Sequence, residues 1–573
     1  MLAHDLVEAG LGDVEVMLEH RLPLSSRRID AILAGRHPRT GAPSYVVVEL
    51  KQWSDAELYE GDPTLVTVSG YGHLPRLHPV EQVRGYCQYL VDFLPGLQDD
   101  EDAVSGVAYL HNATDHSVAP LRQLHESGHA RMFTGQRRGE FLDYLKSRLT
   151  SGVSGARYAD EFEGFRAAPS RQLLAVAADE IRHREQFVLL DQQRLAFNLV
   201  LHATEAARAR DAKTVIVVTG GPGSGKSVIA LSLLGELARQ GRTVIHATGS
   251  RSFTQTLRKI AGRNSPRTQS LFKYFNSFMD ADRNGLEVLI ADEAHRIRET
   301  SANRWTSARL RTDRPQIDEL IAAARVPVFL LDEHQVVRPG EMGTVEDIEA
   351  HAKKTGLAVH KIPLDAQFRC GGSEEYMQWV VRLLGLASGG PLHWIGEPAF
   401  SVQVADTPQE MEHLLRTKLV AGYGARIAAG YCWPWSDPRP DGSLEDDVVI
   451  DDWARPWNLK GQRATGGAPP SALWATDPAG FGQVGCVYTA QGFEYDWNGV
   501  IIGPDLVWRG DGWAVIRSAN KDPDFRSRTK VTEHEFGRLI RNVYKVLLTR
   551  GMVGTILYSP DPETRDLLHT LIR

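Results

Sequence analysis

One segment of the chain has the residue types and spacing that bind a triphosphate. It runs from Gly220 to Ser227, reads GGPGSGKS and matches the pattern GxxxxGK[ST] between an apolar run, 214–219, and a helix-forming stretch. Glycine lets backbone N–H groups turn inward around phosphates, a lysine puts a cation on the β- and γ-oxygens, and a serine hydroxyl binds Mg²⁺. The predicted ATP-binding residues are therefore Gly220, Gly221, Pro222, Gly223, Ser224, Gly225, Lys226 and Ser227, with Ser227 also a metal ligand.

Two acids follow a second apolar run, Val288–Ala291. Asp292 and Glu293 stand where a buried strand ends, which is the end that faces bound phosphates in a parallel sheet. We expect Asp292 to hold Mg²⁺ and Glu293 to orient or deprotonate the attacking water. Upstream, Gln193 either reads the edge of the adenine or is a solvated glutamine on a helix, and the sequence leaves both interpretations open.

A third group of chemical side chains lies near the N-terminus. Asp30 sits in the stretch 26–35, and Glu49 and Lys51 end the stretch 45–51; both read as strands around a Pro/Gly turn. Glu49 and Lys51 are two apart, so they project to one face of a strand that Asp30 can share from the neighbouring strand. Asp30 and Glu49 are thus candidate ligands of Mg²⁺ or Mn²⁺, and Lys51 is a candidate to stabilise charge or position water.

The elements that must position these residues follow a regular rhythm. From 214 to about 355, short β-branched runs alternate with segments of helical length, which predicts βαβ units and a parallel sheet. A second set ends in runs at 500–503 and 554–558, and 429–482 between them is rich in Trp, Pro and Gly and reads as irregular. The predicted domains are 1–150, a connection at 151–186, a first lobe at 187–355, and a second lobe at 356–573 with the insertion at about 429–482.

Composition narrows the class of protein. The 573 residues carry 65 Lys and Arg against 72 Asp and Glu, a net charge of −7, so any nucleic-acid site must be a local basic patch. The 4 cysteines contain no CxxC pair, which argues against a disulfide framework and a structural zinc site. The first residues lack a signal segment, and no apolar run reaches the ~18 residues that span a bilayer. We expect a cytoplasmic protein with no membrane partner.

Further motifs extend the likeness beyond the phosphate loop. Phe329–Gln335, Asp365–Arg369, Tyr488–Asp496 and Leu547–Gly551 follow in the order of motifs III to VI of the superfamily 1 helicases, which the chain resembles. The resemblance implies that Gln335 senses the γ-phosphate and that Glu494 reaches the nucleotide sugar. It also implies that Arg369 and Arg550 are arginine fingers from the second lobe, which would let ATP bridge and close the lobes.

A narrower likeness rests on three short segments. Ala429–Trp435, the pair Trp457-Asn458 and Thr489–Glu494 resemble the Schlafen-type ATPases, over about residues 187 to 573. The resemblance leaves strand separation open, because relatives with these motifs need not all unwind duplexes. The tryptophans at 433, 435, 453 and 457 either stack on unpaired bases or pack the insertion, and packing is the preferred interpretation.

The front stretch resembles the PD-(D/E)xK nucleases of the RecB type. Asp30 and the Glu49-x-Lys51 pair supply the core of that pattern, and Gln82 with Tyr86 supplies its QxxxY element. The resemblance covers about residues 1 to 145 and adds Gln82 to the catalytic candidates and Glu19 to the metal ligands, with Glu15 competing for the second role. The expected fold is a restriction-endonuclease-like α/β domain followed by two RecA-like parallel-sheet lobes.

Together these features predict an ATP-driven nucleic-acid translocase or helicase coupled to a metal-dependent nuclease, in DNA processing or defence against invading genomes. DNA is favoured over RNA as the partner, and a homo-oligomer or a further defence subunit is a possible association. Two alternatives stay open: a nucleotide-gated binding switch that neither cuts nor unwinds, and a nuclease directed at RNA.

Overall fold

The structure, a computed structural model, forms two compact units. It describes residues 1–22, 27–72, 74–98, 101–127, 129–165, 188–210, 212–261, 266–302, 306–307, 311, 314–332, 335–364, 370–398, 400–461, 463–491, 493–529 and 531–572. Of these, residues 1–165 and 188–208 form unit 1, and residues 209–572 form unit 2.

Unit 1 is built on a five-stranded sheet in the order β1-β2-β3-β7-β8. Its strands are β1 (Glu15–Arg21), β2 (Arg28–Arg36), β3 (Pro43–Lys51), β7 (Val104–Leu110) and β8 (Arg131–Thr134). The first three run antiparallel and the last two run parallel to β3. The two strands predicted around Asp30 and Glu49 are therefore confirmed as a pair.

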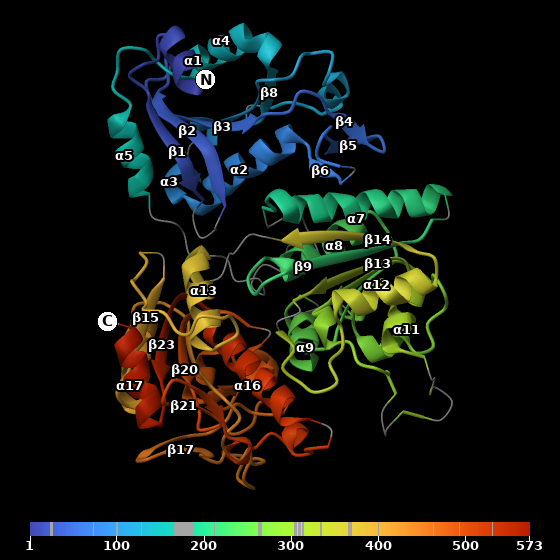
Figure 1. Cartoon of the computed structure of the whole chain (residues 1–573), viewed down its shortest axis with the longest axis vertical. Helices are drawn as coiled ribbons and strands as arrows, with labels where there is room; N and C mark the ends of the chain where they lie inside the picture. The colour runs from blue at the N-terminus through green and yellow to red at the C-terminus, as the bar shows by residue number, and fades with distance from the viewer. Residues whose placement is uncertain are drawn as a thin grey trace. The chain divides into compact units, whose positions relative to one another are not determined.

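Helices cover both faces of this sheet (Figure 1). Helices α1 (Leu2–Glu8) and α4 (Arg138–Arg148) pack on one face, and α2 (Pro79–Phe93) packs on the other. The helices α3 (Pro95–Gln98) and α5 (Ala156–Gly164) and the small sheet β4 (Glu57–Tyr59), β5 (Asp62–Thr67) and β6 (Arg76–Leu77) complete the fold of this part of the unit. Ala31 and Val48 face each other in the core with α1 and α4, so alternation along the strands turns Asp30 and Glu49 toward α2.

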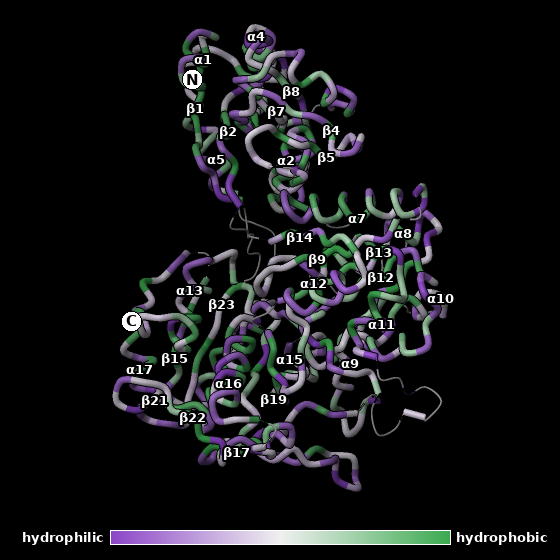
Figure 2. The backbone as a smooth tube through the Cα atoms, turned by 45° about the vertical axis from the view of Figure 1, so that its right-hand side comes forward, coloured by the Kyte–Doolittle hydropathy of each residue, from purple (hydrophilic) through white to green (hydrophobic). Residues whose placement is uncertain are grey.

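Unit 2 begins with a six-stranded, fully parallel sheet in the order β11-β10-β12-β13-β9-β14, as the alternating pattern predicts. The strands are β9 (Thr214–Gly220), β10 (Val244–Thr248), β11 (Phe272–Tyr274), β12 (Leu286–Asp292), β13 (Ala324–Leu331) and β14 (Ala358–Leu364). The helices are α8 (Lys226–Arg239), α9 (Arg251–Ile260), α10 (Pro266–Ser270), α11 (Gln316–Ala323) and α12 (Val345–Lys354). Figure 2 shows apolar residues gathered along the strands.

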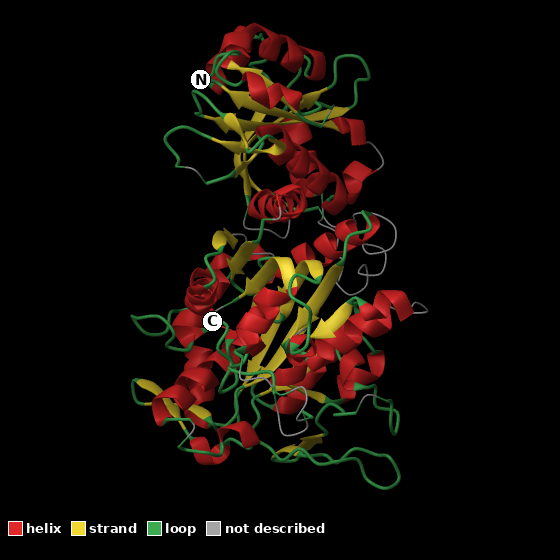
Figure 3. Ribbon diagram, turned by 90° about the vertical axis from the view of Figure 1, so that its right-hand side faces the viewer, coloured by secondary structure: helices red, strands yellow, loops and turns green. Residues whose placement is uncertain are grey.

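A second parallel sheet follows, in the order β15-β23-β20-β16-β19. Figure 3 shows the strands of the chain in yellow with helices, in red, beside them. Its strands are β15 (Ser401–Val404), β16 (Ala425–Ala429), β19 (Val484–Cys486), β20 (Tyr495–Ile501) and β23 (Gly551–Tyr558). The helices are α13 (Glu374–Leu383), α14 (Pro408–Val420), α15 (Val487–Ala490), α16 (Glu533–Leu548) and α17 (Pro562–Leu571). Two hairpins extend it, β17 (Val448–Ile450) with β18 (Trp453–Arg455) and β21 (Leu506–Arg509) with β22 (Gly512–Val515).

Two predicted boundaries need correction. The first sheet extends past 355, because β14 pairs along its whole length with β9; we therefore call 209–364 the first lobe and 370–572 the second. Helix α7 (Asp191–Arg210), predicted to begin the first lobe, groups with unit 1 up to residue 208. Polar contacts explain the grouping, since His202 lies 3.2 Å from Glu60 and 3.4 Å from Asp62.

The insertion has the irregular form that its composition predicts. Between β16 and β19 the described residues form the β17–β18 hairpin and two short 3₁₀ helices, Ser471–Leu473 and Pro478–Gly482. All 4 cysteines are buried, and none of them forms a disulfide. No helix in the described part of the chain is both long and apolar enough to cross a membrane.

Candidate functional site

The phosphate loop joins the end of β9 to the start of α8. Gly223 and Gly225 have φ angles of 82° and 84°, a left-handed conformation that side-chain-bearing residues rarely adopt. No side-chain hydrogen bond caps the start of α8 in the described structure, and the N-terminus of a helix attracts an anion. The ammonium of Lys226 donates to the carbonyls of Gly220 and Gly221, at 2.7 and 2.8 Å, and so lies folded over the loop. The half-buried Ser227 follows it.

Asp292 ends β12 at the same edge of the sheet. Its carboxylate is 1% exposed; Oδ1 accepts from the Glu293 amide at 2.9 Å, and Oδ2 lies 3.3 Å from Nε2 of His246 on the neighbouring strand β10. A carboxylate held on both oxygens is fixed in orientation, as a metal ligand needs. His246 was not among the sequence candidates, because only the pairing of β10 with β12 brings it to Asp292.

Glu293 is surrounded by cations from both lobes. Burial raises the pKa of this carboxyl, but His295, Arg296 and Arg550 outweigh that effect and lower it below its ordinary value. Arg296 is the nearest base, with Nε 3.1 Å from the carboxylate. Arg550 belongs to the second lobe, whereas Glu293 belongs to the first. Glu293 therefore stays ionised, and its electrostatics depend on the second lobe.

Arg550 is held rigidly by its own lobe. It is fully buried, and it donates from Nε to the Val546 carbonyl at 2.9 Å and from Nη1 to the Gln491 carbonyl at 2.7 Å. Gln491 in turn accepts from Arg296 and donates to the carbonyl of Gln335, at 3.2 Å, both in the first lobe. The predicted motifs III, V and VI thus meet around the acids that end β12.

Helix α16 makes a second junction between the lobes. Asn542 donates to the carbonyl of Val336 at 2.9 Å. Burial lowers the pKa of Lys545, and the charge of Asp332 partly offsets this lowering. Neither residue was a candidate from the sequence, because α16 reads as an ordinary amphipathic helix. An asparagine and a lysine at positions that the helical period turns inward are the signal that could have shown that these positions do more than pack.

Three sequence candidates remain, and the structure describes two of them. Arg369 lies outside the described residues, so its predicted role stays a prediction. Glu494 is half-buried, immediately ahead of β20. Gln193 is buried in unit 1, where its side-chain oxygen accepts from the Leu190 amide at 3.2 Å.

A large basic groove runs between the two lobes. It has a volume of about 1370 Å³, and its lining comes from separate residues between Thr248 and Glu341 of the first lobe and from Arg463, Pro523, Asp524, Ser527 and Val531 of the second. Tyr274 and Phe275 add aromatic rings to its wall. Its cations are Arg251, Arg258, Lys259, Arg296, Arg298, Arg338 and Arg463, against the acids Glu299, Glu341 and Asp524. This excess of positive charge is the local patch that a chain of net charge −7 requires to hold nucleic acid.

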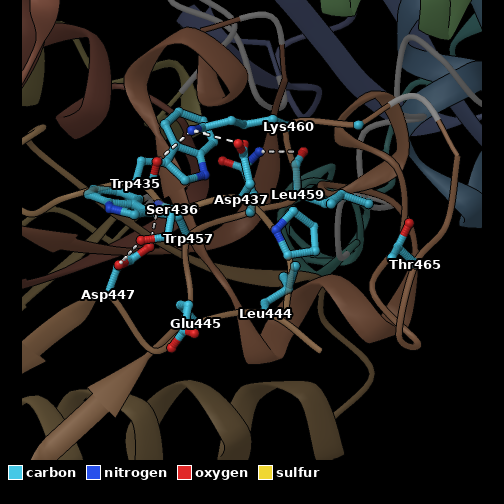
Figure 4. A pocket seen from close by; sticks show the side chains of 13 residues that line it. Trp435, Ser436, Asp437, Leu444, Glu445, Asp447, Trp457, Leu459, Lys460 and Thr465 are labelled. Carbon is cyan, nitrogen blue, oxygen red and sulfur yellow. Dashed lines mark hydrogen bonds and ion pairs between the residues drawn. The ribbon is translucent and has the colours of Figure 1, made fainter. Parts of the chain in front are cut away.

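The tryptophans of the insertion make hydrogen bonds and ring contacts within the second lobe. Trp433, Trp453 and Trp457 donate their indole N–H groups to the Val449 carbonyl, the Glu412 carboxylate and the Pro434 carbonyl. Trp435 lines a cavity of about 260 Å³ beside Trp457, with the ammonium of Lys460 5.3 Å from its ring centre (Figure 4). These contacts favour the packing interpretation over base stacking.

The front acids lie together on the α2 face of the unit 1 sheet. Lys51 donates to Oε1 of Glu49 at 2.7 Å, and Asp30 accepts from the Leu50 amide at 2.7 Å. Glu49 is 5% exposed, and its Oε2 has no hydrogen-bond partner within the described structure. Burial raises the pKa of Glu49 to about 7; Lys51 opposes this shift, and Asp30 adds to it.

The QxxxY pair reaches the same face from α2. Gln82 donates to the Tyr86 hydroxyl at 2.9 Å, and that hydroxyl donates to Asp191 at 2.9 Å. Glu15 and Glu19 are exposed residues on β1, and Glu19 interrupts the pairing with β2 at a φ of 47°. No group of three or more His, Cys, Asp or Glu side chains within the described ranges is arranged to hold a metal ion. A metal ion held by Asp30 and Glu49 would need water or substrate to complete its shell.

A family model covers most of unit 2. The model of the Schlafen group 3 DNA/RNA helicase domain matches residues 213–561, which is more than half of the chain. The chain belongs to the Schlafen group 3 family. Its phosphate loop, its acids at 292 and 293, Arg550 and the basic groove all fall inside the matched range. The helicase-like P-loop fold of the Schlafen group 3 chain is therefore shown, whereas the carboxylate site at Glu49 lies ahead of it.

The relatives of this Schlafen group 3 protein are distant. It is 22% identical over 397 residues to the uncharacterized protein YPL245W of Saccharomyces cerevisiae, covering 62% of this chain and 83% of the relative. Among solved structures it matches the Pif1 helicase of Candida albicans with a TM-score of 0.29 and 11% identity, over 65% of this chain and 95% of that one. AMPPCP-bound DnaA of Aquifex aeolicus gives a TM-score of 0.19 at 15% identity, over 35% and 54%. The chain spans about half the length of the first two structures it matches.

Proposed function

We propose that this Schlafen group 3 protein is a nucleic-acid-dependent ATPase that translocates on or unwinds nucleic acid. The observation that carries the proposal is the position of Arg550: it belongs to the second lobe, yet its charge acts on Glu293 of the first. Phosphoryl transfer is catalysed mainly by positioning and by stabilising charge. Closure of the lobes around ATP would thus complete the site, with Lys226 and Arg550 on the phosphates and Asp292 and Ser227 on Mg²⁺.

The groove supports a strand-binding role for the same two lobes. Its walls come from both lobes, so a change in their spacing during ATP turnover would change the grip on a strand held there. Guanidinium groups bind phosphates, and rings such as Tyr274 offer a face to unpaired bases. A single strand in this groove is therefore the partner that we propose, with DNA favoured over RNA.

For unit 1 we propose a metal-dependent phosphodiesterase. Asp30 and Glu49 would hold Mg²⁺ or Mn²⁺, which when bound polarises the phosphodiester and lowers the pKa of water. The buried Oε2 of Glu49, without a hydrogen-bond partner among the described residues, fits a metal ligand. Lys51, held 2.7 Å from Glu49, would stabilise negative charge on the phosphate. A motor joined to such a nuclease suits DNA processing or defence against invading genomes.

Two substitutions separate the two activities. Lys226→Ala is expected to abolish ATP turnover, and Lys51→Ala is expected to abolish cleavage while ATP turnover continues. Labelled single- and double-stranded DNA and RNA, with Mg²⁺ or Mn²⁺ and with or without ATP, supply the readouts. Loss of both activities from Lys51→Ala alone would contradict separate sites, and tight nucleotide-dependent binding with neither cleavage nor translocation would favour a binding switch.

A further inference from the structure

The carboxylate of Asp191 lies at the proposed nuclease site, although it is far from that site in the sequence. Its Oδ1 and Oδ2 accept from the Tyr86 hydroxyl at 2.9 and 3.1 Å, and Nε of Arg27 lies 3.3 Å from Oδ2. The Arg27 guanidinium also donates to Gln192, the next residue of α7. All four residues belong to unit 1. The Arg27 guanidinium and the Tyr86 hydroxyl thus both contact the carboxylate of Asp191.

This anion also lies close to the hydrolytic pair. The charges of Asp191 and Asp30 both act on the Glu49 carboxyl. The Tyr86 hydroxyl that donates to Asp191 also accepts a hydrogen bond from Gln82 on the α2 side of the sheet. The Asp191 side chain is 10% exposed and that of Arg27 is 20% exposed. Solvent, and therefore a nucleic-acid strand, has little access to these donors while Asp191 occupies them.

The donors themselves are those that bind a phosphodiester. A guanidinium pairs with carboxylate and phosphate oxygens in the same geometry, and a phenolic hydroxyl donates to either anion. Asp191 also has a φ of 41°, a left-handed conformation that aspartate tolerates better than most residues and that turns the chain at the start of α7. Its carboxylate therefore occupies a place that suits one phosphate of a strand.

We propose that Arg27 and Tyr86 form a phosphate-binding subsite beside Glu49 and Lys51, and that Asp191 occupies this subsite until nucleic acid displaces it. The proposal rests on the metal-dependent nuclease function proposed above and adds to it a substrate contact and a means of restraint. A strand phosphate and the Asp191 carboxylate carry like charge and compete for the same donors, so they exclude each other. Removing the charge of Asp191 should open the subsite.

The test measures binding of fluorescein-labelled single-stranded oligothymidylate by anisotropy, without nucleotide and in a Lys51→Ala background in which the probe is not cut. Asp191→Asn should tighten binding at least about tenfold, since a charged hydrogen bond of this kind is released to the strand. Asp191→Glu keeps the charge and should bind as the parent does. Asp160→Asn, an exposed substitution of the same kind in unit 1, is the matched control and should change nothing.

Arg27→Ala identifies where the added binding arises. The gain from Asp191→Asn should vanish when Arg27 is also removed, whereas a gain that came from the basic groove of unit 2 would persist. Unchanged or weaker binding by a folded Asp191→Asn variant, or a gain independent of Arg27, would overturn the subsite. Should Asp191→Asn fail to fold, Asp191→Ser provides the same test, and thermal unfolding reports the folded state of each.

Cleavage by the chain with Lys51 intact separates this proposal from the nuclease proposal. Asp191→Asn should raise the cleavage rate. If no variant cuts any substrate yet Asp191→Asn binds tighter through Arg27, the nuclease function fails and the subsite stands. If the parent cuts in a Lys51-dependent manner and Asp191→Asn changes neither binding nor cleavage, the subsite fails and the nuclease function stands.

Discussion

Substituting Arg550 with glutamine removes one charge from the junction of the two lobes and leaves an amide nitrogen at the position of the arginine Nε. The guanidinium is fully buried, makes two hydrogen bonds to backbone carbonyls and holds the pKa of Glu293 down together with His295 and Arg296. A glutamine amide can replace one of these hydrogen bonds but none of the charge. Arg550→Gln therefore probes the proposed catalytic role more than the packing.

Two magnitudes follow from this geometry. One lost hydrogen bond leaves a buried carbonyl unsatisfied, which lowers the free energy of unfolding by about 1–3 kcal/mol. The loss of an arginine finger lowers kcat for phosphoryl transfer by about 10³-fold or more. The expected variant is folded, binds ATP through the phosphate loop and turns it over about a thousandfold more slowly than the parent.

Arg426, on β16 of the same lobe, offers a matched control. It is also buried, and it donates to the carbonyls of Trp474 and Asp477, at 2.8 and 2.6 Å, while the titratable groups that act on it are Tyr495 and Asp477. Arg426→Gln should lose similar stability and keep ATP turnover. Steady-state phosphate release and nucleotide binding, measured on both variants, decide the matter. Equal turnover by the two variants would refute a catalytic role for Arg550.

Three further predictions concern a cap, a strand pair and the groove. Burial lowers the pKa of His78, whose neutral ring caps α2, to about 4. Because the folded state resists protonation of this ring, the free energy of unfolding has its full value above the unfolded-state pKa of about 6.5 and falls by about 2 kcal/mol between about pH 7 and pH 5. Thermal unfolding should show this loss, and His78→Asn should remove it. His246→Phe should weaken the apparent Mg²⁺ affinity of the ATPase about 10- to 100-fold, because Asp292 would lose the contact that orients it. An unchanged Mg²⁺ titration would show that the 3.3 Å contact between His246 Nε2 and Asp292 Oδ2 does not support metal binding. Arg251→Ala and Arg298→Ala should each weaken single-strand binding and reduce the slope of log K against log salt by about 0.7, whereas an unaltered slope would place the strand elsewhere.

The parallel sheets and the front strand pair were predictable because their signals are local. The β-branched runs at 215–218, 288–291 and 328–331 are typical of strands that are buried on both faces of a parallel sheet. The two-residue spacing of Glu49 and Lys51 puts both side chains on one face of any strand. The phosphate loop is similarly local, since its glycines and Lys226 are contiguous. These elements require no knowledge of which strands become neighbours.

Residues that depend on long-range pairing were not predictable. His246 reaches Asp292 only because β10 lies beside β12, and a histidine on an apolar strand carries no sign of its partner. Arg296 and Gln491 meet across the lobes from segments far apart in the sequence. Asp191 carries no sequence signal of its contacts with Tyr86 and Arg27 in unit 1. The extent of the first sheet depends on β14, whose mixed polar and apolar residues give no indication of its partner β9.

The rate of ATP hydrolysis with and without single-stranded nucleic acid tests the central proposal most directly. Phosphate release by the intact chain, measured beside Lys226→Ala with single-stranded DNA and RNA as separate additions, is expected to rise on adding a strand to the parent and to be absent from the variant. Turnover that ignores both nucleic acids, or that persists in Lys226→Ala, would contradict a nucleic-acid-dependent motor built on this phosphate loop.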